Sequence, residues 1–494
     1  MNLLAFPIIV PLFFVVLFIL ISSDRWARKV AIFGGAILLA LAAYLFVQVL
    51  EQDMLVLNIG GWPAPFGITL VMDVFSGLML LTSSFIVFIL SLYAQEFVQR
   101  QEVEKRFYLF FFALVMGVNG AFITGDVFNL YVWFEVMLMA SFVMITLEST
   151  RHQLEGGIKY MALNLVGSFF FLAGLGLLYG KTGTLSMAHL AQLMHSNDPV
   201  AMMNLPTVLF FVAFGIKAAI FPLFFWLPSS YHTPGITVTS LFAGLLTKVG
   251  VYALIRFFTL FFVQDQAFWH SLLLILAGFT MVVGGMAAST HFETRRILSY
   301  HIISQIGYMV MGLGIYTPLA IAGAIFFTLH NMVAKTNTFL ISGVINKLQG
   351  TYYLKNIGGL YRRQPFLAIL FFVPAMALAG IPPLSGFFGK IMLIKAGFDS
   401  RDYLIAAVAI YTGILTLYSM VKIWNEAFLK KDPQEQTQGG SLPKARFAEL
   451  LPSMLLGLAS IGMGVFAAWV FDFTMEAANQ LLNPSVYIQH VLNP

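Results

Sequence analysis

Two consecutive apolar stretches decide the fold of this chain: AFGIKAAIFPLFFWLP, residues 213–228, and SLFAGLLTKVGVYALIRF, residues 240–257. Each carries one lysine, Lys217 or Lys248, near the middle of a segment long enough to cross a bilayer. A lysine at the bilayer centre costs about 2.5–3.5 kcal/mol on insertion scales, so it must face the protein interior or a water-filled cavity. The prolines of the first stretch break its backbone hydrogen bonding, which membranes tolerate only where protein or water satisfies the freed carbonyls. We therefore expect a buried, hydrated site that handles protons.

The composition of the whole chain indicates an all-α polytopic membrane protein. Of its 494 residues, 59% are apolar and 10% charged, and the mean hydropathy is +0.87. Apolar runs of about 20 residues fit helical spans, and the chain lacks the ten-residue alternation of an outer-membrane barrel. We expect the first apolar run to be a span, because it is too long for the core of a signal peptide. The absence of cysteine excludes disulfides and cysteine-ligated zinc or iron–sulfur centres within this chain.

The apolar runs predict 14 transmembrane helices. Of the 27 lysines and arginines, 18 lie in alternate loops and only Lys181 and Arg401 lie in the opposite ones. Because short cytoplasmic loops accumulate these residues, the asymmetry predicts an even number of spans and places both termini outside the cytoplasm. The expected spans lie near residues 2–21, 30–50, 69–95, 107–123, 127–147, 159–180, 206–228, 237–262, 269–289, 299–315, 318–346, 365–398, 403–429 and 449–471.

The order of the spans predicts two inverted five-helix repeats. Spans four to eight and nine to thirteen form two groups of five, so the second group begins on the opposite side of the membrane. The fourth helix of each group carries prolines, and matching interruptions in two halves of a transporter point to its central site. The helix breaks are expected at Pro222 in the seventh span and at Pro382 and Pro383 in the twelfth. The expected segments are an N-terminal three-helix segment (1–106), the first repeat (107–262), the second repeat (263–429), and a cytoplasmic linker with the fourteenth helix and a short tail (430–494).

Three connecting segments receive no chemical role. The stretch EQDMLVLNIGGWPAPFGI, residues 51–68, mixes short alternation with glycine and proline and predicts a hairpin. Residues 430–448 indicate a mobile polar linker. The tail after residue 471 is expected to be short.

A carboxylate in the fifth span is the predicted partner of the first lysine. Glu135 lies in FNLYVWFEVMLMASF about as deep as Lys217. A buried pair of opposite charges favours the charged form of both groups, so approach and withdrawal of Glu135 would hold and release a proton on Lys217. The free energies that correspond to such pKa shifts are comparable with the roughly 2.3 kcal/mol that a membrane potential supplies per charge per 100 mV. The alternative is a static ion pair that joins two helices.

The remaining predicted proton carriers follow along the chain. A relay from Lys217 to Lys248 is followed by His330 and Lys335 in the eleventh span and by Lys390 just after the second helix break. Histidine titrates near neutrality and suits a carrier between lysines. Two secondary positions are His301, in the tenth span, and His232, a candidate point of proton uptake near the cytoplasmic end of the seventh.

Charged residues near the span ends are expected to have structural roles. Arg256 and Lys422 should extend to the membrane interface, with Glu426 as the i,i+4 partner of Lys422. Asp73 and Asp126 should cap helices. Nucleotide-binding motifs and clusters of metal ligands are missing from the sequence, so we expect no cofactor and no metal, and an ion gradient as the source of energy.

At these residues the chain resembles the antiporter-like membrane subunits that complex I shares with the Mrp multisubunit sodium/proton antiporters. The similarity rests on GDVFNLYVWFEVMLMASF (125–142), FGIKAAIFPLFFWLPSSYHTPG (214–235), SLFAGLLTKVGVYALIRF (240–257), RRILSYHIISQIGYM (295–309) and LAGIPPLSGFFGK (378–390), and it covers nearly the whole chain. Taken together, these strings look most like the D subunit of the Mrp type. The resemblance implies a proton path through Glu135, Lys217, Lys248, His330 and Lys390. It also implies work within a multisubunit complex in the bacterial plasma membrane.

The expected function is therefore proton translocation in a sodium/proton antiporter, by a secondary transporter component and not by an enzyme. A row of ammonium groups repels sodium, so the sodium route should lie in another subunit or at an interface between subunits. One alternative is a proton-pumping subunit of a quinone-linked dehydrogenase of the complex I type. Another is a structural scaffold without transport.

Overall fold

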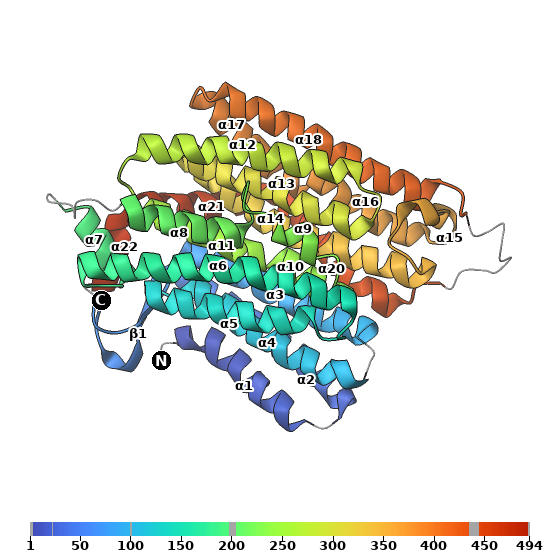
Figure 1. Cartoon of the computed structure of the whole chain (residues 1–494), viewed down its shortest axis with the longest axis horizontal. Helices are drawn as coiled ribbons and strands as arrows, with labels where there is room; N and C mark the ends of the chain where they lie inside the picture. The colour runs from blue at the N-terminus through green and yellow to red at the C-terminus, as the bar shows by residue number, and fades with distance from the viewer. Residues whose placement is uncertain (1–2, 22, 99–100, 197–203, 434–443, 493–494) are drawn as a thin grey trace.

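The computed structural model describes residues 3–21, 23–98, 101–196, 204–433 and 444–492. Its long helices run roughly along one direction, with α1 at one edge of the bundle and α18 at the other (Figure 1). The first half contains η1 (Leu3–Ala5), α1 (Phe6–Leu20), α2 (Asp24–Gln52), η2 (Ile59–Gly61), α3 (Val74–Phe97), α4 (Gln101–Ile123), α5 (Val127–Ile145), α6 (Arg151–Thr182), α7 (Met187–Met194), α8 (Asn204–Ala218), α9 (Trp226–Ser230), α10 (Ile236–Gly244) and α11 (Leu246–Leu260). The second half contains α12 (Gln266–Thr290), α13 (Thr294–Ile315), α14 (Pro318–Gln349), η3 (Leu354–Asn356), α15 (Leu360–Arg363), α16 (Pro365–Ala379), α17 (Ser385–Asp399), α18 (Tyr403–Trp424), η4 (Asn425–Leu429), α20 (Phe447–Val465), α21 (Ala467–Leu482) and α22 (Pro484–Leu492).

The chain is a multi-pass membrane protein. Within the described residues, 11 helices are long and apolar enough to cross a membrane, and α10 with α11 counts as one of them. Two shorter apolar helices, α8 and α16, are the first halves of the interrupted spans. Helix α13 occupies the expected tenth span but is not among the 11, so the number 14 stays a prediction. The strand β1, the start of α1 and the helix α22 lie at one end of the bundle (Figure 1), as an even number of crossings requires.

Two helices are interrupted near the prolines at which the sequence predicts breaks. After α8 ends at Ala218 the chain turns through Pro222 into α9, and the carbonyl of Ile216 accepts a hydrogen bond of 2.8 Å from the indole of Trp226. Helix α16 ends at Gly380, whose φ of 87° lies in the left-handed region that favours glycine. A third interruption, at Leu245 between α10 and α11, was not predicted, because this stretch contains no proline.

The most deeply buried elements lie at the centre of the bundle. Helices α10, α11 and α14 have almost every residue buried. Helix α14 packs against α3, α10, α13, α16, α17, α20 and α21. Nearly every residue of this 32-residue helix is buried among other helices, so its polar side chains lie in the protein interior and do not face lipid.

The segments outside the repeats differ in part from expectation. The hairpin is present, but its strands are β1 (Leu55–Asn58) and β2 (Thr69–Met72), antiparallel, with Leu55 opposite Met72. The third span therefore begins at Val74 and not at residue 69. The tail after residue 471 is helical: α21 continues to Leu482, and α22 follows it. Most of the predicted linker falls outside the described residues.

Candidate functional site

Lys217 is held by helix α6 and not by the predicted carboxylate. Its side chain is buried, and Nζ donates to the backbone oxygen of Asn164 at 3.3 Å and to Ser168 Oγ at 3.2 Å. Among the described residues it forms no ion pair within 4.0 Å, so Glu135 acts on Lys217 electrostatically without direct contact in this conformation. The ring of Phe134, beside Glu135 in sequence, lies with its centroid 5.9 Å from Nζ. Lysine and carboxylate are thus in the same region without direct contact.

A small cavity adjoins Lys217. Its volume is about 20 Å³, and its walls include Phe134, Tyr160, Asn164 and Lys217. This is just enough space for one water molecule, which also needs polar partners of the kind found here. Glu135 Oε1 is buried and has no hydrogen-bond partner within the described structure. A carboxylate oxygen without a partner and a lysine beside a water-sized cavity form the kind of pair that water can bridge.

Lys248 lies just after the unpredicted helix break. It stands in the first turn of α11, is fully buried, and its Nζ donates to the backbone oxygen of Ala243 in the last turn of α10. The last carbonyls of a helix lack intrahelical partners and carry the negative end of its dipole. The interruption at Leu245 therefore provides the acceptor that holds this ammonium group in the interior.

Lys390 repeats the same arrangement at the second predicted break. Its Nζ donates to the backbone oxygens of Leu378 at 2.8 Å and Ala379 at 3.1 Å, both at the end of α16. A Cβ at Gly380 would lie 2.8 Å from Lys390 Cδ, so the missing side chain of this glycine lets the lysine stem pass. Two of the predicted lysines are thus bound to the carbonyl end of the half-helix that precedes them.

The groups between these lysines are buried on α13 and α14. Lys335 is fully buried, has no hydrogen-bond partner among the described residues, and interacts electrostatically with both Lys248 and Lys390. His301 and His330 each interact with Lys335 and Lys390. The structure therefore brings these five predicted residues into one buried group. Lys217 and Lys248 are linked less directly, through the packing of α8 against α11.

Several buried polar side chains near this buried group were not predicted from the sequence. They belong to the charge-neutral types, and at least one polar atom of each has no partner within the described structure: Thr247, Ser304, Gln305, Asn331, Asn337 and Thr412. Buried polar atoms in native structures are nearly always satisfied, by protein or by ordered water. The signal that could have found them was the presence of amides within apolar runs such as LHNMVAKTNTFLISG.

His232 lies beside a large polar cavity, where proton uptake was predicted. The cavity of about 780 Å³ is lined by His152, His232, Glu293 and Arg296, among others. The Nε2 of His232 accepts from Arg296 at 3.2 Å, and Nδ1 donates to the backbone oxygen of Pro228 at 2.9 Å. Burial and the positive charge of Arg296 lower the pKa of His232 to about 4. At neutral pH its imidazole is therefore uncharged.

Two expected interfacial side chains are placed differently. Arg256 is buried within the protein and donates to both carboxylate oxygens of Asp73, at 2.6 and 2.8 Å, so its charge is met by a carboxylate at the start of α3 and not by solvent. Lys422 does not pair with Glu426, since Glu426 bonds Lys430 at 2.9 Å. Lys422 Nζ instead donates to backbone oxygens of Ser289 and His291 at the end of α12.

The capping aspartates are where the sequence predicts them. Asp73 accepts a hydrogen bond of 2.9 Å from the backbone N–H of Ser76 at the start of α3. Asp126 accepts one of 2.7 Å from the backbone N–H of Asn129 at the start of α5. Both satisfy N–H groups that a helix start leaves unpaired.

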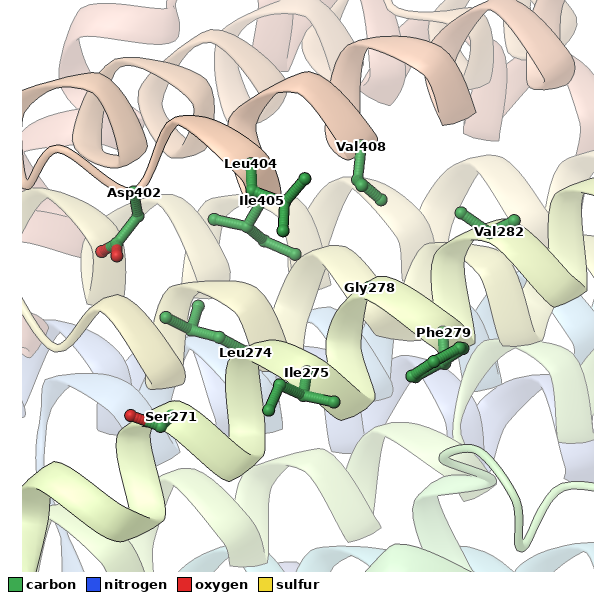
Figure 2. A pocket seen from close by; sticks show the side chains of 10 residues that line it. All are labelled: Ser271, Leu274, Ile275, Gly278, Phe279, Val282, Asp402, Leu404, Ile405 and Val408. Atoms are coloured by element: carbon green, nitrogen blue, oxygen red, sulfur yellow. The ribbon is translucent and has the colours of Figure 1, made fainter.

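A separate apolar pocket of about 560 Å³ lies between α12 and α18. Figure 2 shows aliphatic side chains such as Leu274, Ile405 and Val408 around it, with Asp402 at one side. None of the predicted site residues lines it. In the described part of the chain, no three histidine, aspartate or glutamate side chains are grouped as metal ligands would be.

Residues 124–416 match the family described as "NADH:quinone oxidoreductase/Mrp antiporter, TM". The chain belongs to this family. The matched range contains every predicted proton carrier from Glu135 to Lys390.

Individual relatives extend the similarity of this family member to its full length. It is 44% identical to the D subunit of a Na(+)/H(+) antiporter of Alkalihalophilus pseudofirmus, over 99% of each chain. Among solved structures it is similar to a chain of the Mrp complex from Dietzia sp. DQ12-45-1b, with a TM-score of 0.92, 30% identity, and coverage of 100% of this chain and 99% of that one. A chain of respiratory complex I from Thermus thermophilus has a TM-score of 0.84 at 24% identity, over 97% of this chain and 100% of that one, which shows a shared fold.

Proposed function

We propose that this chain is the D subunit of a multisubunit Mrp-type antiporter that exchanges Na⁺ for protons, and that its own task is to move the protons. The observation that carries the proposal is the buried row of Lys248, Lys335 and Lys390, with two of the three ammonium groups held on helix-end carbonyls. Buried ammonium groups are expensive in a membrane and are kept where ions or protons pass. The assignment within the complex is supported by full-length similarity to the D subunit of a Na⁺/H⁺ antiporter.

The proposed path begins at Glu135 and Lys217 and continues through Lys248, Lys335, His330 and Lys390. Water would connect Glu135, whose buried Oε1 has no partner within the described structure, to Lys217, which lines a water-sized cavity, in place of the direct ion pair expected from the sequence. Approach of the carboxylate favours the charged lysine, and its withdrawal releases the proton toward Lys248. The proton gradient drives this transfer.

The polar cavity beside His232 is the proposed route of uptake, and His301 is a second lining group beside the row. We place this cavity on the cytoplasmic side and both termini on the other side of a bacterial plasma membrane. The matching interruptions after α8 and α16 support two inverted repeats, 107–262 and 263–429, within 14 spans. Since the row of lysines repels cations, the sodium route is proposed to lie in another subunit or at an interface.

The first test removes the two groups at the start of the path. Glu135→Ala and Lys217→Ala should each lower cation-dependent proton exchange in everted vesicles by about 100-fold, the lower range for losing a positioned proton-transfer group. Lys159→Ala is the matched control, because Lys159 is 52% exposed and, among the described residues, its ion pair is with its helix neighbour Glu155. Normal exchange in both variants, with normal amounts of assembled complex, would exclude the proposed path. Reduced assembly with unchanged specific activity would instead support a scaffold.

A further inference from the structure

Helix α20 lies outside both proposed repeats, yet one of its faces is polar and buried. Its buried polar residues are Glu449, Ser453 and Ser460, at spacings of four and seven residues, which place them on one face of a helix. The opposite face is apolar and exposed, with Leu458 and Val465 turned outward. A helix that needed only to anchor the chain in lipid has no use for such a buried polar face.

One end of this face reaches the central row through hydroxyl groups. His330 Nδ1 lies 2.8 Å from Ser385 Oγ, and Ser385 Oγ lies 3.0 Å from Ser460 Oγ. The contact is enforced by close packing, because a Cβ at Gly464 would lie 2.2 Å from the backbone oxygen of Pro383. Helix α20 therefore packs directly against the break in the twelfth span, and Ser460 extends the hydrogen-bonded chain that begins at His330.

The middle of the face holds polar atoms without partners. Both amide atoms of Asn337 and the hydroxyl of Ser453 are fully buried and have no hydrogen-bond partner within the described structure. Asn337 faces α20, since a Cβ at Gly457 would lie 3.8 Å from its Nδ2. Buried polar atoms in native structures are nearly always satisfied by protein or ordered water, so these atoms are suited to bridging by water.

The other end of the face opens at a charged cluster near the surface. Glu449 Oε1 lies 2.9 Å from Lys347 Nζ and 2.9 Å from Arg446 Nε. Arg446 is 61% exposed, so the cluster meets solvent. From Glu449 to Ser460 the helix rises about 16 Å, roughly half the thickness of a bilayer core.

We propose that the α14–α20 seam is a second proton branch, which joins the surface cluster at Glu449 to His330 through Ser453, Asn337, Ser460 and Ser385. The inference rests on the proposed proton-translocating function. Each hydroxyl or water accepts one proton on a lone pair and releases its own to the next group, and it then turns back before the next transfer. The amide of Asn337 carries no proton: it orients the water that bridges Ser453 and Ser460. The branch supplies protons to the second half of the row, while Glu135 and Lys217 supply the first half, and exchange requires both inputs.

Transport measurements test the branch against the main path. Asn337→Leu together with Ser453→Val should lower proton exchange in everted vesicles about tenfold, because the two changes remove a transferring hydroxyl and the amide that orients its water. Asn337→Gln with Ser453→Thr should restore most of the rate. Ser271→Val, at an exposed serine of α12, is the control for the same change outside the seam. If the double variant exchanges protons at the native rate while Lys217→Ala lowers the rate about 100-fold, the branch alone is refuted. Native exchange in both would refute the proposed function too.

Thiol accessibility gives a second measurement that does not depend on transport. The native chain has no cysteine, so Ser453→Cys introduces its only thiol. Silver(I) is small enough to follow a water-lined path, and it reacts with the thiolate. The folded protein is treated with silver(I), denatured, and then labelled with a fluorescent maleimide. A thiol that silver(I) has reached is protected from the maleimide. Protection should be about tenfold faster than for Ala277→Cys, a fully buried apolar position of α12. Equal rates at the two positions would overturn the proposal.

Discussion

Single lysines in this protein are stabilised mainly by backbone oxygens, which sequence reasoning could not foresee. The sequence placed Lys217, Lys248 and Lys390 correctly in the interior, because apolar surroundings of that length leave no other location. It did not predict their partners, since the exact ends of α10 and α16 depend on tertiary packing. The same reason explains Arg256: its partner Asp73 lies 183 residues away in the chain.

His232 provides the pH-dependent prediction at this scale. Burial and Arg296 lower the pKa of His232 from 6.5 to about 4. Between pH 6.5 and about 4 the unfolded chain binds a proton that the folded chain does not. The free energy of unfolding is therefore highest above the unfolded pKa of 6.5 and decreases as the pH falls toward 4. The melting temperature of the purified complex should therefore fall on going from about pH 7 to about pH 5, and should fall less in His232→Gln, whose amide oxygen can still accept from Arg296. Equal falls in both proteins would contradict this assignment.

Interrupted helices are the elements that bring the site together, and only those with prolines were predicted. Pro222, Pro382 and Pro383 cannot donate backbone hydrogen bonds, so their positions identify two breaks. The break at Leu245 leaves no mark of this kind in the sequence. The polar face of α20 was also missed, because two serines in an apolar span resemble ordinary packing residues.

The packing of α20 on the twelfth span can be tested with two glycines of the same helix. Gly464→Ala should lower the melting temperature of the complex, at a cost of about 1–3 kcal/mol, since its Cβ would meet the backbone of Pro383. Gly462→Ala is the matched control, because a Cβ there meets nothing within 4 Å. The control should be neutral or slightly stabilising, by up to about 1 kcal/mol. Similar losses in both variants would show that α20 is not held against the break.

At the scale of the molecule, composition predicted a multi-pass helical protein, while the number of spans is harder to obtain from hydropathy. Helix α13 shows the reason: it has 22 residues, and nearly all are buried, yet its sequence TRRILSYHIISQIGYMVMGLGI is rich in polar residues. A span enclosed by other helices does not need the hydropathy of one that faces lipid. Burial of this kind is known only once the neighbours are placed.

The assembly of the whole complex distinguishes the two transport functions found in this family. The chain should co-purify in mild detergent with other antiporter subunits, and the preparation should show no flavin or iron–sulfur absorbance. Such absorbance in proportion to the chain would favour a quinone-linked dehydrogenase. Absorption spectra together with identification of the co-purifying chains decide between them.

In the proposed proton path, the two backbone carbonyls that accept from Lys390 determine how this lysine would release its proton. A charged lysine has three N–H groups, and Leu378 and Ala379 accept two of them. The neutral amine keeps two N–H groups, so it can retain both bonds after the third proton has departed. Proton release would then require no rotation of the side chain. The released proton would come from the N–H group that neither of these two backbone oxygens accepts, and the neutral amine would stay in position to bind the next proton.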